Sequence, residues 1–290
     1  MIWLWQLYIA ASLLLIWGFI AVIWARGGAG SGSYEFMRLA VYTVPGLLAI
    51  GFKWIVERRG FRRAFPELGV SWGRMRFWPL IILVPAVAIT VSHGIPALSG
   101  IARPDPSLSG LAEEIARAGQ PIPPDIWGFF WAKLGLSLSL GLLIFLPIAA
   151  LAEMGFRAYP LELLSERFGP RLTLALVGAF WAIALLPFLF LRNPYGSWLG
   201  IPVYLGFSWG WGSLMAWLYT KARTVLVPAL CLIILDVLDQ SLSYILPGNP
   251  LLSGAEGVFG AGFLVIIGCL VVAFTDRIYI PPKKPKPDKP

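Results

Sequence analysis

The chain has 290 residues, of which 58% are hydrophobic and only 13% are charged, and its formal net charge at pH 7 is +8. Soluble domains carry about 25% charged residues, so this composition excludes a soluble globular protein and indicates an integral membrane protein. The basic excess does not indicate nucleic-acid binding, because the lysines and arginines are spread over separate segments between apolar runs.

Eight apolar runs are long enough to cross a hydrocarbon core of about 30 Å, which takes about 20 helical residues. In chain order they cover residues 2–24, 39–56, 77–98, 126–152, 172–191, 198–220, 225–246 and 258–275. The second run is the weakest, since Pro45, Gly46 and Lys53 interrupt it. We expect the ammonium of Lys53 to reach the headgroup region from near the helix end. The runs predict an all-α polytopic membrane protein with eight transmembrane helices.

The basic residues between these runs are distributed unequally between the two sides. With the amino terminus inside, the inner segments hold Arg58, Arg59, Arg62, Arg63, Arg74, Arg76, Arg157, Arg167, Arg171, Lys221, Arg223, Arg277, Lys283, Lys284, Lys286 and Lys289. The outer segments hold only Arg26, Arg38, Arg103, Arg117 and Arg192. An excess of Lys and Arg marks the cytoplasmic side. We therefore expect a multi-pass protein of the cell membrane with both termini in the cytoplasm, whose basic loops contact anionic headgroups of the lipid bilayer.

The organisation along the chain predicts three regions and no soluble domain. Residues 1–125 hold the first three membrane helices, a basic cytoplasmic loop and an outer loop in which residues 108–118 can form an amphipathic surface helix. Residues 126–246 hold the fourth to seventh helices, which we expect to form the core. Residues 247–290 hold the eighth helix and a Lys/Pro-rich tail that we expect to be extended.

An acid and a base lie four residues apart near the end of the fourth run, at Glu153 and Arg157. This spacing puts both side chains on one helix face. Charges within a membrane are costly unless they are paired or face a polar cavity, so such a pair is either a structural ion pair or a functional site. We expect both side chains to face the bundle interior, with Arg157 hydrogen-bonded to another helix.

Two further carboxylates, Asp236 and Asp239, lie three residues apart on the seventh run, close to the expected bilayer midplane. Three interpretations remain open for them. They can be structural, paired with Lys133, Arg157 or backbone amides; they can form a binding or proton site in a polar cavity; or they can share a proton as a catalytic dyad. Carboxylates at the midplane also suit a proton-coupled carrier.

The histidine and cysteine content excludes several kinds of site. His93 is the only histidine, so a metal centre with two histidine ligands is excluded. Cys231 and Cys269 lie inside apolar runs, where a free thiol behaves as a small hydrophobic side chain. We expect no metal and no cofactor, and no nucleic-acid partner.

The segment Glu153-Met-Gly-Phe-Arg157, followed by residues 161–169, resembles the first motif of the CAAX-protease and bacteriocin-processing (CPBP or ABI) family of intramembrane glutamic endopeptidases. The motif of that family is Glu-Glu-x-x-x-Arg, usually with Phe before the Arg. Residues 66–71 and 216–223 also resemble connecting segments of the family. The resemblance implies an eight-helix CAAX-protease-like bundle and, in the family, hydrolysis of peptides within the membrane.

The departures from the family pattern concern the reacting groups. The resemblance puts Ala152 where the family has the glutamate that activates water. It puts Leu185 and Ile233 at the two histidines and Val237 at the asparagine. Glu153 and Arg157 are then remnants of the catalytic motif. Because Ala, Leu and Ile cannot move a proton, we expect the family fold without its reaction.

This resemblance leaves three functions to compare. The first is a catalytically silent relative that binds or stabilises a membrane-protein or peptide partner. The second is an active intramembrane endopeptidase with rearranged carboxylates, namely Glu153, Asp236 and Asp239. The third is the proton-coupled carrier.

Overall fold

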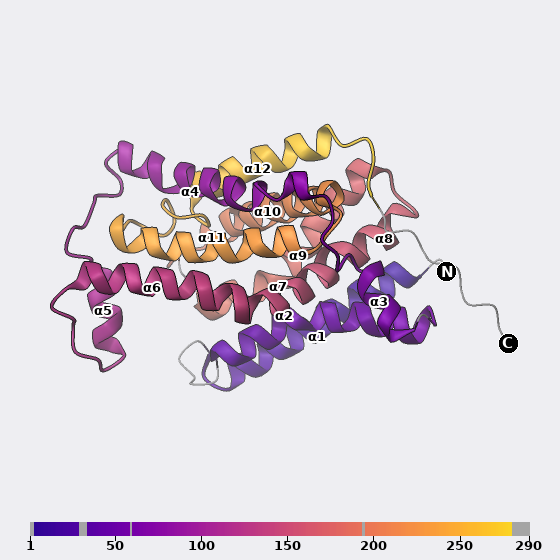
Figure 1. The fold of residues 1–290 in the computed structure, drawn as a ribbon, viewed down its shortest axis with the longest axis horizontal. Helices are drawn as coiled ribbons and strands as arrows, with labels where there is room; N and C mark the ends of the chain where they lie inside the picture. The colour runs from indigo at the N-terminus through magenta and orange to yellow at the C-terminus, as the bar shows by residue number, and fades with distance from the viewer. Residues whose placement is uncertain (1–2, 29–33, 59, 193–194, 280–290) are drawn as a thin grey trace.

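The structure, a computed structural model, describes residues 3–28, 34–58, 60–192 and 195–279, and this part of the chain is helical without any strand. Figure 1 shows most of the helices running along one common axis. The α-helices are α1 (Leu4–Ala25), α2 (Tyr34–Gly51), α3 (Phe61–Glu67), α4 (Leu80–Leu98), α5 (Ser109–Arg117), α6 (Ile126–Leu140), α7 (Leu146–Glu153), α8 (Tyr159–Ser165), α9 (Pro170–Arg192), α10 (Gly200–Ala222), α11 (Leu226–Ile245) and α12 (Val258–Ala273). Three π-helical turns, η2 (Phe52–Val56), η4 (Gly141–Phe145) and η5 (Met154–Ala158), and the 3-10 turn η3 (Met75–Phe77) complete them.

Each of the eight predicted runs forms a helix, and six helical segments are long and apolar enough to cross a membrane. These six are Leu4–Ala25, Phe36–Val56, Met75–Leu98, Ile126–Ser165, Pro170–Leu191 and Leu226–Ile245. The helix α10 is not among them, and α12 is an apolar helix of only 16 residues. An all-helical protein with several membrane-spanning helices is therefore confirmed, whereas the number of eight spans stays a prediction.

One helical segment, Ile126–Ser165, continues through α6, η4, α7, η5 and α8 for 40 residues. At 1.5 Å per residue it is about 60 Å long, roughly twice the thickness of the hydrocarbon core. The two π-helical turns η4 and η5 interrupt its α-helical hydrogen bonding, and such turns are frequent at functional sites. The second of them contains Arg157 and directly follows Glu153, so the candidate motif lies at an irregular part of the helix.

Glycines allow close approach of α9, α10 and α12 in the core. A Cβ added to Gly210 would lie 2.4 Å from the carbonyl oxygen of Leu264, and one added to Gly178 would lie 2.3 Å from the hydroxyl of Ser213. Small residues at such contacts let helix backbones approach within a membrane. The glycines of α10 therefore serve packing between helices.

The helix α1 is fixed to α2 and η5 by a buried tyrosine. The Tyr8 hydroxyl lies 2.9 Å from the carbonyl oxygen of Pro45 and 2.7 Å from that of Gly155. A Cβ at Gly155 would lie only 2.1 Å from the Pro45 backbone. The irregular turn η5 is thus held against α2. The helix α2 continues through Pro45, where the sequence suggested the weakest of the eight runs.

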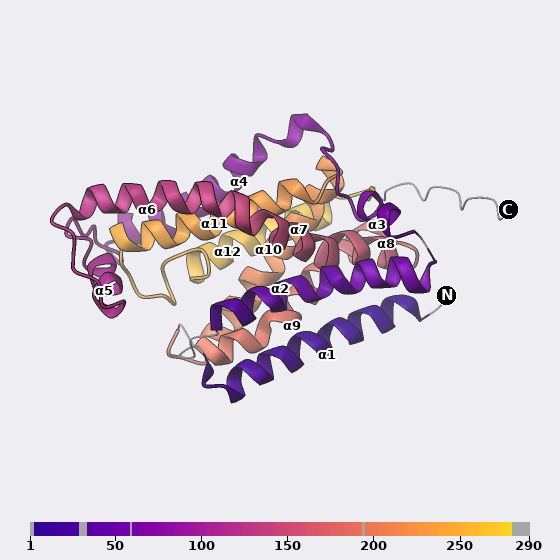
Figure 2. The ribbon, with the colours of Figure 1, turned by 60° about the horizontal axis from the view of Figure 1, so that its bottom comes forward.

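The predicted amphipathic helix of the outer loop is confirmed as α5. Its buried residues Leu111 and Ile115 pack with Phe130 of α6. Lys133 of α6 donates to Glu114 of α5 at 2.6 Å. The loop is therefore attached to the bundle. Figure 2 shows that α5 projects beyond the other helices.

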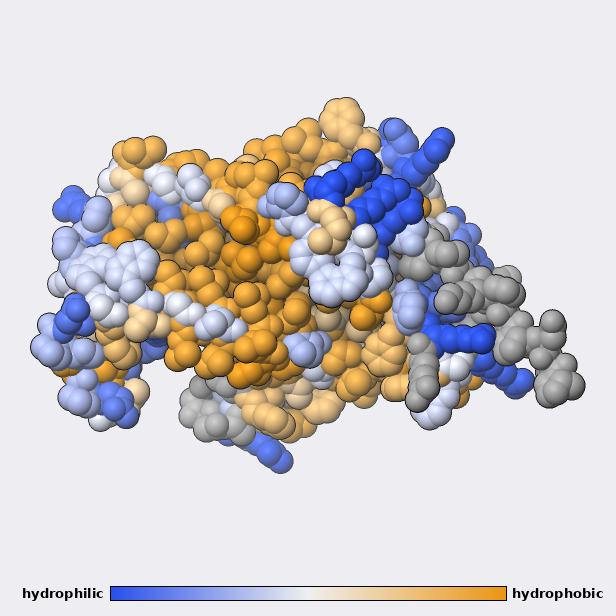
Figure 3. Space-filling view, in the orientation of Figure 1, coloured by the Kyte–Doolittle hydropathy of each residue, from blue (hydrophilic) through white to orange (hydrophobic). Residues whose placement is uncertain are grey.

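The surface of the bundle carries a broad apolar band between two hydrophilic ends (Figure 3). The helix α1 begins and α12 ends at the same end of the bundle, where α3 and α8 also lie (Figures 1 and 2). This arrangement agrees with an even number of membrane crossings. The cytoplasmic assignment of that end stays a prediction, and the Lys/Pro-rich tail at residues 281–290 lies outside the described residues.

Candidate functional site

Glu153 and Arg157 form a buried ion pair inside the bundle. Arg157 Nη1 donates to Glu153 Oε1 at 2.8 Å, and the two side chains are 1% and 0% exposed. Burial in the interior is confirmed, but the expected hydrogen bond from Arg157 to another helix is wrong. The guanidinium instead lies over the ring of Trp181 on α9, 4.3 Å from its centroid. A cation over an indole face is attracted without a hydrogen bond. The Trp181 ring of α9 therefore attracts the guanidinium group of Arg157.

A cavity of about 490 Å³ lies next to this pair, between α2, α6, η4, α7 and α11. It is lined by Arg38, Leu39, Tyr42, Leu136, Ser137, Leu140, Gly141, Ile144, Phe145, Ile148, Ala149, Ala152, Leu232, Ile233, Asp236, Val237 and Gln240. Several of its α6 and η4 residues are exposed, Leu136 and Ile144 among them, and both belong to the long apolar segment Ile126–Ser165. We call this space the lateral cavity.

The lateral cavity brings together three of the four positions at which the resemblance puts reacting groups. Ala152 comes from α7, and Ile233 and Val237 come from α11, about 80 residues further along the chain. Their meeting in one cavity supports the alignment of two separate motifs. All three side chains are apolar and can neither activate water nor donate to an oxyanion.

The fourth position, Leu185, lines a smaller cavity of about 90 Å³. This second cavity is lined by Tyr42, Trp181, Leu185, Tyr204, Phe207, Ser208, Leu232, Leu235, Asp236, Asp239, Ala255 and Glu256. Asp236 lines both cavities, Asp239 lines only the smaller one, and the buried Glu153 lines neither. The three candidate carboxylates therefore do not meet in a single cavity.

Asp239 is held by two groups, one of which the sequence did not indicate. Its Oδ1 lies 2.9 Å from Nε2 of His93 on α4 and accepts a hydrogen bond from the backbone N–H of Ala255 at 2.7 Å. Pairing with a backbone amide, which was one of the structural alternatives for the two aspartates, is found for Asp239. Pairing of Asp239 with Lys133 or Arg157 is wrong, because Lys133 binds Glu114 and Tyr244 while Arg157 binds Glu153.

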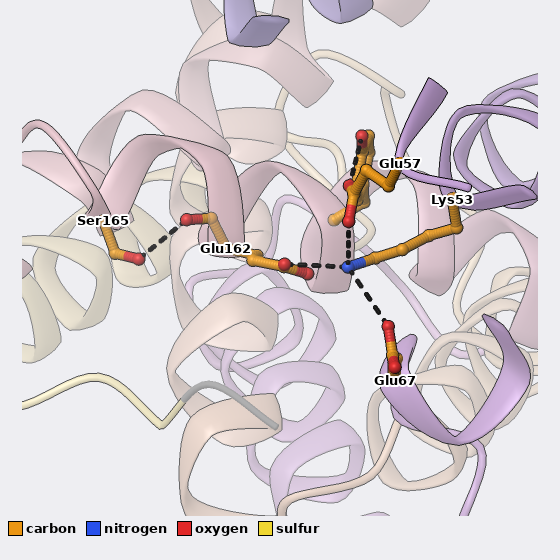
Figure 4. Close-up of polar contacts among 6 residues, drawn as sticks. Lys53, Glu57, Glu67, Glu162 and Ser165 are labelled. Atoms are coloured by element: carbon orange, nitrogen blue, oxygen red, sulfur yellow. Dashed lines mark hydrogen bonds and ion pairs between the residues drawn. The ribbon is translucent and has the colours of Figure 1, made fainter. Parts of the chain in front are cut away.

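A second buried charged cluster surrounds Lys53 (Figure 4). Its members on α3 and α8 come from the end of the bundle where both helices lie in Figure 1. The ammonium lies 2.7 Å from Glu162 of α8, 3.1 Å from Glu57 and 3.6 Å from Glu67 of α3. The Lys53 side chain is 0% exposed, so the expectation that it reaches the headgroups is wrong. Three carboxylates around one ammonium compensate for its burial, and they join η2, α3 and α8.

The only sign of this cluster in the sequence is Glu57, four residues after Lys53. Glu67 and Glu162 are distant in sequence. They lie within residues 66–71 and 161–169, which resemble segments of the family, but nothing in those segments indicated a contact with Lys53. The Tyr159 hydroxyl extends the cluster by donating to Glu57 at 2.9 Å. In the described part of the chain no group of three or more His, Cys, Asp or Glu side chains is arranged to hold a metal ion.

Comparison with known families supports the resemblance read from the sequence. The family model described as "Type II CAAX prenyl endopeptidase Rce1-like" matches residues 134–238. The matched segment begins in α6 and ends in α11, so it contains the Glu153–Arg157 pair and Ala152, Ile233 and Val237. No curated protein shows a significant match to the chain. The chain therefore contains an Rce1-like segment, and this segment supplies most of the wall of the lateral cavity.

Proposed function

We propose that this Rce1-like membrane protein is a catalytically silent relative of the CAAX prenyl endopeptidases that binds an apolar chain of a membrane partner in its lateral cavity. The observation that carries the proposal is the position of Ala152, Ile233 and Val237. All three line the cavity, where the resemblance would put a glutamate, a histidine and an asparagine. The cavity is present, and apolar side chains stand where the resemblance would put reacting groups.

The replaced side chains argue against peptide hydrolysis by the family's route. Hydrolysis requires a group that removes a proton from water and donors that stabilise the oxyanion. The nearest acid of the motif, Glu153, is sealed in the interior and paired with Arg157. A carboxylate in that position cannot reach water or substrate in the lateral cavity, so we expect binding without cleavage.

The shape and composition of the lateral cavity suit an apolar chain with a polar group. Its volume of about 490 Å³ lies within the usual range of ligand pockets, about 300–1,000 Å³. From Leu136 to Ala152 it follows helices for 16 residues, roughly 24 Å. Its polar side chains include Arg38, Asp236 and Gln240. A prenylated carboxyl-terminal peptide has both features, and it is the substrate class in the name of the matched family.

The second candidate function is an endopeptidase with rearranged carboxylates. Asp236 and Asp239 favour it, because both line the smaller cavity. However, Asp239 is engaged by His93 and Ala255, and Glu153 lines neither cavity. A dyad that shares a proton needs two carboxylates in contact, and we therefore rank this function below silent binding.

A proton-coupled carrier is the third candidate, and the position of the cavities argues against it. A carrier needs a polar path that can reach each side of the membrane in turn. The cavity linings come from α2, α6, α7, α9, α10 and α11, with η4 and the segment around Ala255. No residue that lines these two cavities belongs to α3 or α8. These helices lie at the end of the bundle that holds the Lys53 cluster, so neither of the two cavities extends to them.

A binding assay with cavity-filling variants tests the proposal. The full-length protein in lipid nanodiscs is titrated with a fluorescent farnesylated CAAX peptide, using wild type, Ala152→Phe and Val237→Phe. Leu143→Phe is the matched control, because this neighbouring η4 residue is 74% exposed and does not line the cavity. We expect at least about tenfold weaker binding for the two filling variants, wild-type binding for the control, and intact peptide throughout. Equal binding by all four proteins would contradict the assignment of the cavity.

A further inference from the structure

Two turns are joined into one rigid unit at the end of the bundle where α3 lies. The first is the segment 69–74, which leads from α3 toward α4, and the second is the turn 222–225 between α10 and α11. The backbone N–H of Arg74 donates to Ala222 at 2.7 Å, and that of Val225 donates to Gly69 at 3.0 Å. A Cβ at Gly73, which has φ +61°, would lie 2.2 Å from the Ala222 oxygen. Backbone contacts of this closeness fix the two turns relative to each other.

Side chains reinforce the same contact. The hydroxyl of Ser71 donates to the carbonyl of Arg223 at 3.2 Å, and the hydroxyl of Thr224 donates to the carbonyl of Ser71. Arg223 ends α10 in the left-handed conformation, with φ +61°. Its side chain therefore leaves the helix in a direction set by the turn.

The unit presents three arginines, Arg74, Arg76 and Arg223, without a carboxylate partner in the described part of the chain. Arg76 lies over the ring of Phe77 and Arg223 over that of Tyr279, at 4.9 and 4.3 Å from the ring centroids. Desolvation and the nearby guanidinium groups of Arg223 and Arg76 lower the pKa of Arg74. Arg74 is therefore repelled by Arg223 and by Arg76, and an anion beside these guanidinium groups would relieve this repulsion.

Aromatic side chains beside the arginines place the unit at the membrane interface. Trp72 is 71% exposed and lies beside Trp78, with 5.6 Å between ring centroids, and the Trp78 indole N–H donates to the carbonyl of Trp72 at 3.0 Å. Exposed Trp residues are typical of the headgroup level of a bilayer. The membrane segment Met75–Leu98 begins immediately after Arg74. In Figure 3 strongly hydrophilic side chains lie against the apolar band over the segment that joins α3 to α4.

We propose that Arg74, Arg76 and Arg223 form a binding site for the phosphate of an anionic lipid headgroup, held in place by the two joined turns. The planar guanidinium group binds phosphate oxygens through two parallel N–H donors. The arginines lie at the level where the Trp pair meets the headgroups, so a lipid phosphate reaches them without leaving the bilayer. The site is independent of the lateral cavity, and its lipid stays bound whether or not a partner occupies that cavity.

Native mass spectrometry of the full-length protein tests this site. The protein is released from nanodiscs that contain phosphatidylglycerol or only phosphatidylcholine, and the retained lipids are counted. The variant carries Arg74→Gln, Arg76→Gln and Arg223→Gln. The control carries Arg167→Gln, Arg171→Gln and Arg277→Gln, which remove the same charge from other segments. Each basic residue near a membrane surface contributes about fivefold in affinity, or about 1 kcal/mol. We therefore expect the variant to lose more than about tenfold in phosphatidylglycerol retention and the control to keep it.

Three outcomes would overturn the proposal. Equal loss in the variant and in the control would show a diffuse effect of net charge. Equal retention of phosphatidylcholine and phosphatidylglycerol by wild type would show no preference for an anionic headgroup. Displacement of the lipid by inorganic phosphate at millimolar concentration would identify a site for free phosphate. Should the triple variant fail to fold, Arg76→Gln replaces it, because this exposed side chain contacts only the Phe77 ring among the described interactions, and about fivefold loss is then expected.

Discussion

Arg157 donates to Glu153 at 2.8 Å in a site where both side chains are buried, and it does so from a π-helical turn of the same helix. The pair therefore needs no second helix to neutralise its charge, and α9 supplies only the ring of Trp181. We expect the pair to stabilise the irregular turn η5, in which Arg157 lies.

We expect Arg157→Met to destabilise the protein strongly, because it leaves the Glu153 carboxylate buried without its cation. Breaking a buried ion pair by removing one partner costs about 3–5 kcal/mol. Thermal unfolding of the purified protein in detergent measures the effect. The control is Arg117→Met, whose pair with Glu113 is exposed on α5 and is worth about 0–1 kcal/mol. Equal melting temperatures for the two variants would contradict the structural role.

Removal of the Lys53 ammonium is expected to separate α3 from the bundle. In Lys53→Met the carboxylates of Glu57, Glu67 and Glu162 lose their shared cation and repel one another. Limited proteolysis between α3 and α4 measures the separation. Lys221→Met is the control, because among the described residues the interaction seen for that side chain is with the Trp217 ring. Cleavage at the wild-type rate in Lys53→Met would show that the cluster does not hold α3.

Substitution of Gly155 tests the contact between η5 and α2. The added methyl group of Gly155→Ala would lie 2.1 Å from the Pro45 backbone, whereas that of Gly135→Ala meets nothing within 4 Å. Overpacking of this kind costs about 1–3 kcal/mol. We expect a lower melting temperature for Gly155→Ala and a small change for Gly135→Ala. The reverse order would contradict the close packing of these two elements.

The attachment of α5 is expected to weaken in acid. Partial burial opposes ionisation of Glu114, but hydrogen bonds from Lys133 and Tyr244 and the charges of Lys133 and Arg117 outweigh it, so the pKa of Glu114 is lowered from its ordinary value of 4.5. A carboxyl whose folded pKa is lowered stabilises the fold above its unfolded pKa, and this contribution is lost as the pH falls through the folded pKa.

Hydrogen exchange in α5 measures this loss between pH 6 and pH 3. We expect protection of α5 in wild type to fall over this range by more than that of α9. Glu114→Gln should show weaker protection at pH 6 and little further change in acid. A wild-type response in Glu114→Gln would show that another group controls the attachment.

Local patterns in the sequence predicted a large part of this fold. Apolar runs gave helices close to the expected residues, because a membrane requires each long run to satisfy its own backbone hydrogen bonds. The spacing of Glu153 and Arg157 predicted their pairing, because side chains four residues apart lie on the same face of one helix. The eight membrane crossings stay a prediction, because α10 and α12 do not combine both the length and the hydropathy of the six spans.

Contacts between distant segments could not be predicted from these patterns. His93 and Asp239 are 146 residues apart, and Lys53 and Glu162 are 109 residues apart. The two residues of each pair lie on different helical segments, so their meeting depends on how the helices pack. The prediction for Lys53 failed because a lysine near a helix end ordinarily reaches the headgroups, whereas α3 and α8 surround this one with carboxylates.

A combined measurement of binding and cleavage distinguishes a lateral cavity that binds a lipidated chain from one that also cleaves it. A farnesylated CAAX peptide with a fluorophore at each end is incubated with the protein in nanodiscs, and binding and product are recorded from the same sample. We predict saturable binding that Val237→Phe weakens and Leu143→Phe does not, with no product above the level without protein. Turnover by wild type that is lost in Glu153→Gln, Asp236→Asn or Asp239→Asn would contradict the claim and establish the rearranged enzyme.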